Sequence, residues 1–171
     1  DGAIITPGCD SMRRLDECWR KAGKDIEGAI PPFFFHYGVP HKYSDYTVKW
    51  MTEETRRLIA AVEEHFSVKI SDDELKKAIQ LYNQSRLLLD RFEALRTLDA
   101  PPFSGEDALA VILAGTTMPR EEYNKLLEQF IADAEKTSGI RDRVRLMLVG
   151  SANDDVELVR VMEGGKAIVV A

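Results

Sequence analysis

The sequence predicts an α/β fold in which parts of two parallel-sheet domains are joined by a helical middle region. Three observations predict it. The chain begins with an apolar run that is followed by a turn and a helix pattern. Its middle has successive apolar stripes at helical spacing, and its end has a strand–helix–strand pattern. We therefore expect residues 1–44 to be the C-terminal part of a first α/β domain and residues 45–139 to be the helical region. Residues 140–171 would be the first βαβ unit of a truncated second α/β domain.

The first part of the chain predicts two strands and two helices. An apolar strand pattern covers Asp1–Ile5, and after a Pro-Gly turn we expect a helix over Asp10–Ala22, with Gly23 as its stop. The aromatic run Phe33–Phe35 is typical of a short buried strand, and a helix is expected from about Asp45 to His65. The apolar stripe of the first helix consists of Met12, Leu15, Cys18, Trp19 and Ala22.

The middle of the chain is marked by helix start signals. Ser71–Glu74 has the pattern of a capping box and opens a long helix that ends before Pro101. Ser104 is expected to cap a shorter helix. Pro119 suits the first turn of a further helix, which should run to about Lys136.

The last part of the chain predicts one βαβ unit. A continuous apolar strand is expected over Val144–Val149, followed by a polar loop over Gly150–Asp155. A helix over Val156–Glu163 then leads to a second strand, Ala167–Val170. The crossover of such a unit is expected to be right-handed.

Composition excludes several classes of function. Hydrophobic residues make up 44% and charged residues 30% of the 171 residues, as in ordinary globular proteins. The net charge of −6 gives no reason to expect nucleic acid as a partner, and no apolar run approaches the roughly 20 residues of a membrane span. The two cysteines have neither zinc nor disulfide spacing. We expect a cytoplasmic protein, and the apolar strand patterns at both ends favour a fragment of a longer chain.

Cys9 is the main candidate site residue. It follows the first strand and precedes a helix, and ligands of open α/β sheets bind at the carboxyl ends of strands. The positive end of the helix favours a thiolate, which can ligate a metal or attack an electrophile. From the residues alone, a buried or inert thiol is the favoured interpretation, because a free cysteine commonly behaves as a small hydrophobic residue. Asp10 is interpreted as the N-cap of the helix.

Other candidates have plainer interpretations. Cys18 lies on the apolar stripe and is interpreted as core packing. His36 and His41 flank a turn where a substrate or phosphate could be contacted, although a structural or solvent-exposed role is the simpler interpretation. His65 stands near a helix end, where a positive charge is favourable.

The loop after the strand of the βαβ unit is a candidate substrate site. Ser151, Asn153 and Asp154 lie in it, together with Asp155. The alternative is that Asn153 or Asp154 caps the next helix. No GxGxxG motif follows the strand, so a dinucleotide site is not expected.

Several short segments, in their order and spacing, resemble the subunits of the 2-hydroxyacyl-CoA dehydratase and benzoyl-CoA reductase family. The resemblance covers the whole chain. The segments are Cys9-Asp10-Ser11-Met12-Arg13, Val39-Pro40, Ile70-Ser71-Asp72-Asp73-Glu74-Leu75, Ala78-Ile79, Tyr82-Asn83, Arg86-Leu87-Leu88, Pro101-Pro102, Ser104-Gly105, Gly150-Ser151, Asp154-Asp155 and Glu157-Leu158.

The resemblance implies a fold, a cofactor and partners. Each subunit would have two Rossmann-like domains and would pair with a homologous second subunit. A [4Fe–4S] cluster would sit on three cysteines with one iron open, and an ATP-dependent iron–sulfur activator would deliver an electron. In a dehydratase this electron would convert an acyl-CoA thioester to a ketyl radical that loses water, whereas in a reductase related transfers would dearomatise a ring.

Carried over by position, Cys9 would be a cluster ligand. The resemblance places one further ligand before Asp1 and one shortly after the last strand, and Cys18 matches neither. The fragment alone should therefore be inactive and should not hold the cluster. Three alternatives remain beside the dehydratase: a benzoyl-CoA reductase subunit, a related reductase with a double cluster, and a cluster-free docking subunit.

Overall fold

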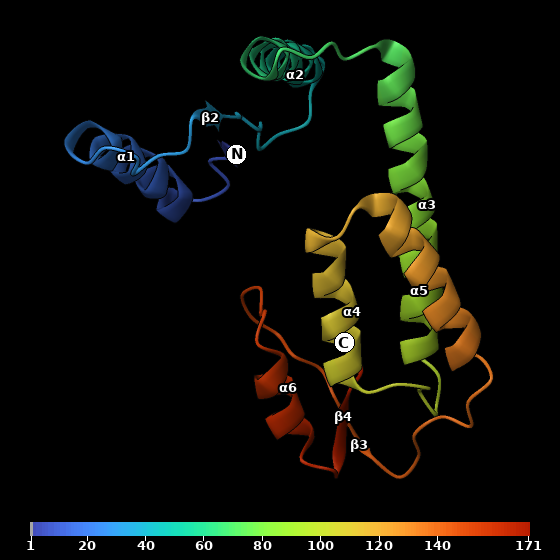
Figure 1. Cartoon of the computed structure of the whole chain (residues 1–171). Coiled ribbons are helices and arrows are strands. Elements are labelled where there is room, and N and C mark those ends of the chain that lie inside the picture. The colour runs from blue at the N-terminus through green and yellow to red at the C-terminus, as the bar shows by residue number, and fades with distance from the viewer. Residues whose placement is uncertain (1) are drawn as a thin grey trace. The chain divides into compact units, whose positions relative to one another are not determined.

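A computed structural model describes residues 2–171 as a helix-rich α/β chain with two pairs of parallel strands (Figure 1). Asp1, the first residue of the expected strand, lies outside the described residues. The chain divides into two compact units, and the boundary between them falls between Asp72 and Asp73. The elements are β1 (Gly2–Ile5), α1 (Asp10–Asp25), β2 (Phe33–His36), α2 (Asp45–Phe66), α3 (Asp72–Arg96), α4 (Gly105–Thr117), α5 (Arg120–Ala134), β3 (Val144–Leu146), α6 (Val156–Glu163) and β4 (Ala167–Val169).

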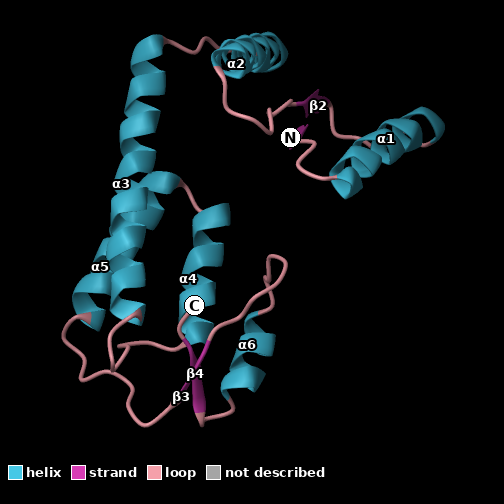
Figure 2. Cartoon of the chain, turned by 180° about the vertical axis from the view of Figure 1, so that it is seen from behind, coloured by secondary structure: helices cyan, strands magenta, loops and turns pink. Residues whose placement is uncertain are grey.

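The α/β class is thus confirmed, with short strands that form two separate two-stranded sheets (Figure 2). The Rossmann-like character of the domains, and the division at residues 44 and 139, stay predictions. Within residues 2–171 no helix is long and apolar enough to cross a membrane.

Unit 1 is a βαβ arrangement followed by one long helix. Strands β1 and β2 pair in parallel, with Gly2 opposite Phe33 and Ile5 opposite His36. Ile5 and Phe33 are buried, and the Phe33 ring lies 5.4 Å from the ring of Phe66 at the end of α2. Neither α1 nor α2 contains a buried residue. The aromatic strand is therefore the centre of a small apolar contact region rather than of a full core.

Unit 2 has a continuous apolar core between helices α3, α4 and α5. Phe92 of α3 is fully buried and stacks on Phe103 at a centroid distance of 4.7 Å. The buried members of the core are Leu88, Phe92, Phe103, Ala108, Tyr123, Leu127, Ile131 and Ala134. Helices α3, α4 and α5, which lie within the expected helical region of residues 45–139, therefore form a bundle with its own core.

A buried carboxylate ties the second sheet to this bundle. Oε1 of Glu163, at the end of α6, accepts hydrogen bonds from the backbone N–H groups of Gly105 (2.8 Å) and Val169 (2.9 Å). The start of α4 at Gly105 thus meets both α6 and β4. Charge-assisted hydrogen bonds of this kind are stronger than neutral ones, so one residue fixes three elements.

The predicted helix boundaries need two corrections. Helix α1 does not stop at Gly23 but continues to Asp25. A Cβ at Gly23 would lie 2.8 Å from the Ile30 side chain, so this glycine allows a close approach rather than a helix end. Pro119 is the N-cap of α5 rather than a residue of its first turn.

A further correction concerns strand length. Strand β3 ends at Leu146, although the apolar run continues to Val149. Its parallel partner β4 is equally short, with Val144 opposite Ala167 and Leu146 opposite Val169. The run is interrupted by the charged residue Arg145, and a hydrogen bond from the Leu148 N–H to the Ala171 carbonyl oxygen (2.8 Å) continues the pairing beyond the assigned strand.

Candidate functional site

The candidate site is built on the carboxyl edge of the sheet of unit 1. Because β1 and β2 are parallel, the segments that follow them, residues 6–9 and 37–44, leave from the same edge. The hydrogen bond from the Tyr37 N–H to the Ile5 carbonyl oxygen (2.9 Å) extends the pairing by one residue into this region. Ligands of open parallel sheets bind outside this edge.

Cys9 occupies the position that the sequence predicts for it, between β1 and α1. It is the N-cap residue of α1, in an extended conformation with φ of −153°, and its side chain makes no capping hydrogen bond. The thiol is exposed. Helices α2 and α4 show the usual alternative, because Ser44 and Ser104 each accept a hydrogen bond from a backbone N–H of the first turn. The role of Cys9 as a ligand stays a prediction.

Two expectations for neighbours of Cys9 are wrong. Asp10 is not the N-cap but the first residue of α1, where its carboxylate lies 3.8 Å from the Arg13 guanidinium. Cys18 is exposed rather than packed in a core. The apolar stripe of α1 exists in the sequence, but Leu15 on the same stripe is also 43% exposed.

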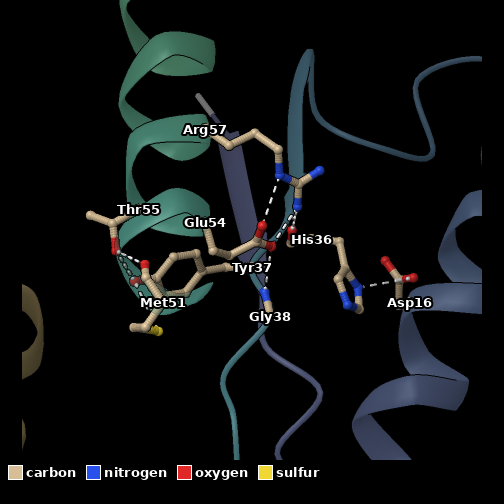
Figure 3. Close-up of polar contacts among 8 residues, drawn as sticks. All are labelled: Asp16, His36, Tyr37, Gly38, Met51, Glu54, Thr55 and Arg57. Carbon is tan, nitrogen blue, oxygen red and sulfur yellow. Dashed lines mark hydrogen bonds and ion pairs between the residues drawn. The ribbon is translucent and has the colours of Figure 1, made fainter. Parts of the chain in front are cut away.

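A polar network fixes the end of β2 against α2 (Figure 3). Oε1 of Glu54 accepts a hydrogen bond from the Gly38 N–H at 3.0 Å, and Oε2 accepts one from Nε of Arg57 at 2.9 Å. Arg57 also donates to the carbonyl oxygen of His36 at 3.0 Å. The Tyr37 hydroxyl lies 2.9 Å from the Thr55 hydroxyl. Three consecutive residues of the chain are therefore held by α2.

The electrostatics of this network centre on Glu54. Hydrogen bonding from Arg57, with a further hydrogen bond from the Gly38 N–H, holds the pKa of Glu54 below its ordinary value. The Glu54 side chain is only 12% exposed, so its carboxylate is shielded from solvent on most sides. Gly38 is needed here, because a Cβ would lie 2.8 Å from the ring of Trp50.

His36 links the network to the first helix. Its Nδ1 lies 3.4 Å from Oδ2 of Asp16 on α1, and Oδ1 of Asp16 accepts a hydrogen bond from Arg20 at 3.0 Å. His36 is thus a structural residue at the strand end, which agrees with the simpler of its two interpretations. His65 lies against the aromatic strand, with its ring 5.3 Å from that of Phe33.

Sequence reasoning missed Glu54, Arg57 and Tyr37. Glu54 and Arg57 stand three residues apart on a helix, which predicts an ordinary surface ion pair. The sequence does contain one indication of this network. The Gly38-Val39-Pro40 turn ends the strand, so the Gly38 N–H needs a hydrogen-bond partner outside the sheet.

The loop after β3 forms a separate candidate site in unit 2. Ser151 and Asn153 line an open hollow of about 440 Å³ together with Leu158 and Met162 of α6. Asp154 is exposed and does not line this hollow. The helix cap is Asp155, whose side chain accepts a hydrogen bond from the Leu158 N–H at 3.0 Å.

The predicted capping by Asn153 or Asp154 is therefore wrong by one or two positions. Asn153 instead accepts a hydrogen bond from the Asp155 N–H at 3.1 Å through its own Oδ1. This side chain orders the loop immediately before the helix, as asparagine commonly does in turns. Substrate binding by Ser151, Asn153 and Asp154 stays a prediction.

Cys9 and Cys18, the two exposed cysteines, are too far apart to be ligands of one metal cluster. The two residues are nine positions apart along α1, and a rise of about 1.5 Å per residue separates them by roughly 14 Å. In the part of the chain that the structure describes, no group of three or more His, Cys, Asp or Glu residues is arranged to hold a metal ion. A cluster bound here would need thiolates beyond those of α1.

Comparisons with known proteins agree with one another. The family described as "2-hydroxyglutaryl-CoA dehydratase, D-component" matches residues 1–171. A benzoyl-CoA reductase subunit of Thauera aromatica is 29% identical over 155 residues, which is 88% of this chain and 38% of that protein. The Escherichia coli (strain K12) protein named "Putative dehydratase subunit YjiM" is 43% identical over 63 residues, 37% of this chain and 16% of that protein. The chain thus matches well under half the length of each relative.

Proposed function

The chain belongs to the 2-hydroxyglutaryl-CoA dehydratase D-component family, and we propose that it is part of a subunit of an ATP-activated 2-hydroxyacyl-CoA dehydratase. In this proposal Cys9 is one thiolate ligand of a [4Fe–4S] cluster. The reaction removes water from a CoA thioester by one-electron chemistry, with a ketyl radical of the thioester as intermediate. A homologous second subunit and an ATP-dependent iron–sulfur activator would complete the system.

The observation that carries the proposal is the placement of Cys9. Its thiol is exposed at the carboxyl edge of a parallel sheet, on a residue that occupies a helix N-cap without capping it. A sequence that gives up a capping hydrogen bond at such an edge violates a local rule, and such violations concentrate at functional sites. A thiolate is the usual protein ligand of an iron–sulfur cluster.

The chain's own residues would position and bind rather than transfer electrons. When bound, the cluster supplies a low-potential electron and an iron that can act as Lewis acid toward the thioester carbonyl. Glu54 and Arg57 hold the segment after β2 next to the edge from which Cys9 extends. In unit 2, Ser151 and Asn153 would contact the substrate through the hollow that they line. Asp154 would do so from the adjacent exposed position.

A benzoyl-CoA reductase subunit is the second candidate. It is favoured by the 29% identity to the Thauera aromatica reductase subunit across most of this chain. Both candidates place a cluster ligand at Cys9, so they differ in the acyl group and not in the predicted metal site. Assays with a 2-hydroxyacyl-CoA and with benzoyl-CoA, each with activator and ATP, would separate them.

The test is anaerobic iron and sulfide analysis with EPR, on the protein that carries this chain in complex with its second subunit. We compare the wild type with Cys9→Ser, and use Cys18→Ser as the matched control because it is an exposed thiol on the same helix. About four irons per site, lost in Cys9→Ser and kept in Cys18→Ser, would support the proposal. Iron content that is independent of Cys9 would overturn it, and an iron-free complex after anaerobic reconstitution would leave a docking subunit.

A further inference from the structure

Helix α1 is attached to the sheet of unit 1 mainly through one strand, β2. The ring of Trp19 meets the ring of Phe34 edge-on at a centroid distance of 5.5 Å, and the guanidinium of Arg20 lies 4.7 Å from the centre of the Phe34 ring. Asp16 lies one turn earlier on α1. Figure 3 shows its carboxylate turned toward the ring of His36 at the end of β2, with 3.4 Å between Oδ2 and Nδ1.

Asp16 differs from other acidic residues of this helix. Its side chain is only 14% exposed, whereas those of Asp10 and Glu17 are 99% and 62% exposed. One carboxylate oxygen, Oδ1, accepts a hydrogen bond from Nε of Arg20 at 3.0 Å, and the other faces the imidazole. Because Arg20 also lies over the ring of Phe34, Asp16 is connected to β2 both directly and through this arginine.

The amino-terminal half of α1, residues 10–17, has few other contacts that could hold it. Helix α1 contains no buried residue, so apolar packing gives it little support. In the part of the chain that the structure describes, the other ion pairs of this half join two residues of α1 itself, as Arg14 joins Glu17. The contact of Asp16 with His36 therefore connects this half of the helix to the sheet.

Helix geometry relates this contact to Cys9. Cys9 precedes Asp16 by seven positions, which is about 1.9 turns and a rise of about 10 Å. The two residues therefore lie on the same side of α1, and Asp16 shows that this side faces the end of β2. A rotation of α1 about its axis would turn Cys9 away from the sheet edge, and the contact with His36 opposes such a rotation.

We propose that Asp16, together with His36, is a positioning residue for Cys9. The inference rests on the proposed function, in which Cys9 is a cluster ligand, and it assigns to the pair the task of directing the thiol toward the sheet edge. Asp16 and His36 act through α1 and do not bind the cluster. Metal sites depend on such supporting residues, because a ligand has to be held within roughly 0.5 Å of its place.

Hydrogen–deuterium exchange with mass spectrometry tests the contact without a metal. It is measured on the cluster-free protein that carries this chain, in peptides that cover residues 14–18. His36→Ala and Asp16→Ala should each speed exchange there by about three- to fivefold, the size of one ionic contact. The double variant should exchange no faster than Asp16→Ala, because both substitutions remove the same interaction.

Two further variants separate this contact from a general loosening of the helix. Glu17→Ala is the matched control, because it removes an ion pair within α1 and none to the sheet, and it should exchange at the wild-type rate. His36→Asn should restore most of the protection, since its amide N–H can take the place of Nδ1. Exchange that is unchanged in His36→Ala and Asp16→Ala, or equally fast in Glu17→Ala, would overturn the proposal.

Iron loss from the reconstituted complex then tests the effect on Cys9. With excess chelator and without oxygen, His36→Ala should lose iron about tenfold faster than the wild type, whereas His36→Asn and Glu17→Ala should not. Iron that depends on Cys9 but leaves His36→Ala at the wild-type rate would reject this inference and keep the proposed function. Iron that does not depend on Cys9, with faster exchange in His36→Ala, would reject the function and support the attachment of α1 by Asp16.

Discussion

The two compact units hold their elements together by different means. In unit 2, side chains from α3, α4 and α5 meet in one apolar core, in which Phe92 and Ile131 have no exposed surface. In unit 1, Ile5 and Phe33 are the buried hydrophobic residues among those described, and α1 and α2 contribute none. Polar ties such as Glu54 to the Gly38 N–H do much of the positioning there.

The two units should therefore respond differently to substitution, and each contains candidate site residues. Cys9 lies in the unit with little core, after β1, whereas the candidate substrate residues Ser151 and Asn153 lie in unit 2, in the loop after β3. Unit 1 depends on a few specific contacts, so single polar substitutions should change its site more than its helices. Unit 2 should respond in the opposite way, mainly to changes in packing. The predictions below test this contrast from the largest expected effect to the smallest.

Phe92→Ala should lower the free energy of unfolding of unit 2 by about 3–5 kcal/mol, because it leaves a cavity beside Phe103. Urea unfolding followed by far-UV circular dichroism measures the loss. Both tryptophans, Trp19 and Trp50, lie in unit 1, so their fluorescence reports that unit separately. Leu87→Ala, at a position 66% exposed on the same helix, is the control. An equal shift of the fluorescence transition would break the contrast and show that the units unfold together.

Glu163→Ala should destabilise unit 2 by about 2–4 kcal/mol, because two buried backbone N–H groups lose their acceptor. Glu163→Gln should lose less, since both hydrogen bonds are made to Oε1 and an amide oxygen can replace it. The same urea titration measures both variants. Glu157→Ala, an exposed glutamate of the same helix, should change stability by less than about 1 kcal/mol. A loss in Glu163→Gln as large as in Glu163→Ala would show that the charge matters more than the geometry.

Glu54→Gln should destabilise unit 1 by about 1–2 kcal/mol, through weaker bonds to Arg57 and the Gly38 N–H. The effect should depend on pH. The folded pKa of Glu54 is below its ordinary value of 4.5, so its stabilisation is complete above that value and is lost as the pH falls through the lower folded pKa. Trp50 fluorescence during urea unfolding, at a series of pH values, measures this.

The control for Glu54 is its exposed neighbour Glu53. Glu53→Gln should leave both the stability and its pH dependence close to those of the wild type. In Glu54→Gln, by contrast, the free energy of unfolding should fall less on acidification than it does in the wild type. If the free energy of unfolding of Glu54→Gln fell on acidification as much as that of the wild type, other carboxylates, and not this network, would be responsible for the pH dependence of unit 1.

The parts of the fold that could be predicted from the sequence are those set by local signals. Helix α2 is predicted over Asp45–His65 and runs over Asp45–Phe66, and α6 has the predicted bounds, Val156–Glu163. The spacing of apolar residues and the capping residues each involve only a few neighbouring positions, so the helices that they determine can be predicted from the sequence. The Cys9 position after the first strand is predictable for the same reason.

What could not be predicted depends on contacts between distant residues. Glu54 and Gly38 are 16 positions apart, and nothing in the helix pattern distinguishes Glu54 from an ordinary exposed glutamate. The exposure of Cys18 likewise depends on what covers the stripe of α1, and periodicity gives only the stripe. The end of strand β3 at Leu146 likewise depends on its pairing with β4, which the hydrophobic pattern up to Val149 does not reveal.

Cys9→Ser should change stability least, and in the opposite direction. Serine is among the preferred N-cap residues, and Cys9 makes no capping hydrogen bond, so the serine hydroxyl can bind a free N–H of the first turn of α1. We expect unit 1 to gain about 0.5 kcal/mol, measured by tryptophan fluorescence in urea. Cys18→Ser, at an exposed position within the helix, should gain nothing. A higher free energy of unfolding in Cys9→Ser would show that the protein has a thiol at the sheet edge in place of a helix cap. A lower one would show that this thiol stabilises the fold, and it would weaken the case for a ligand.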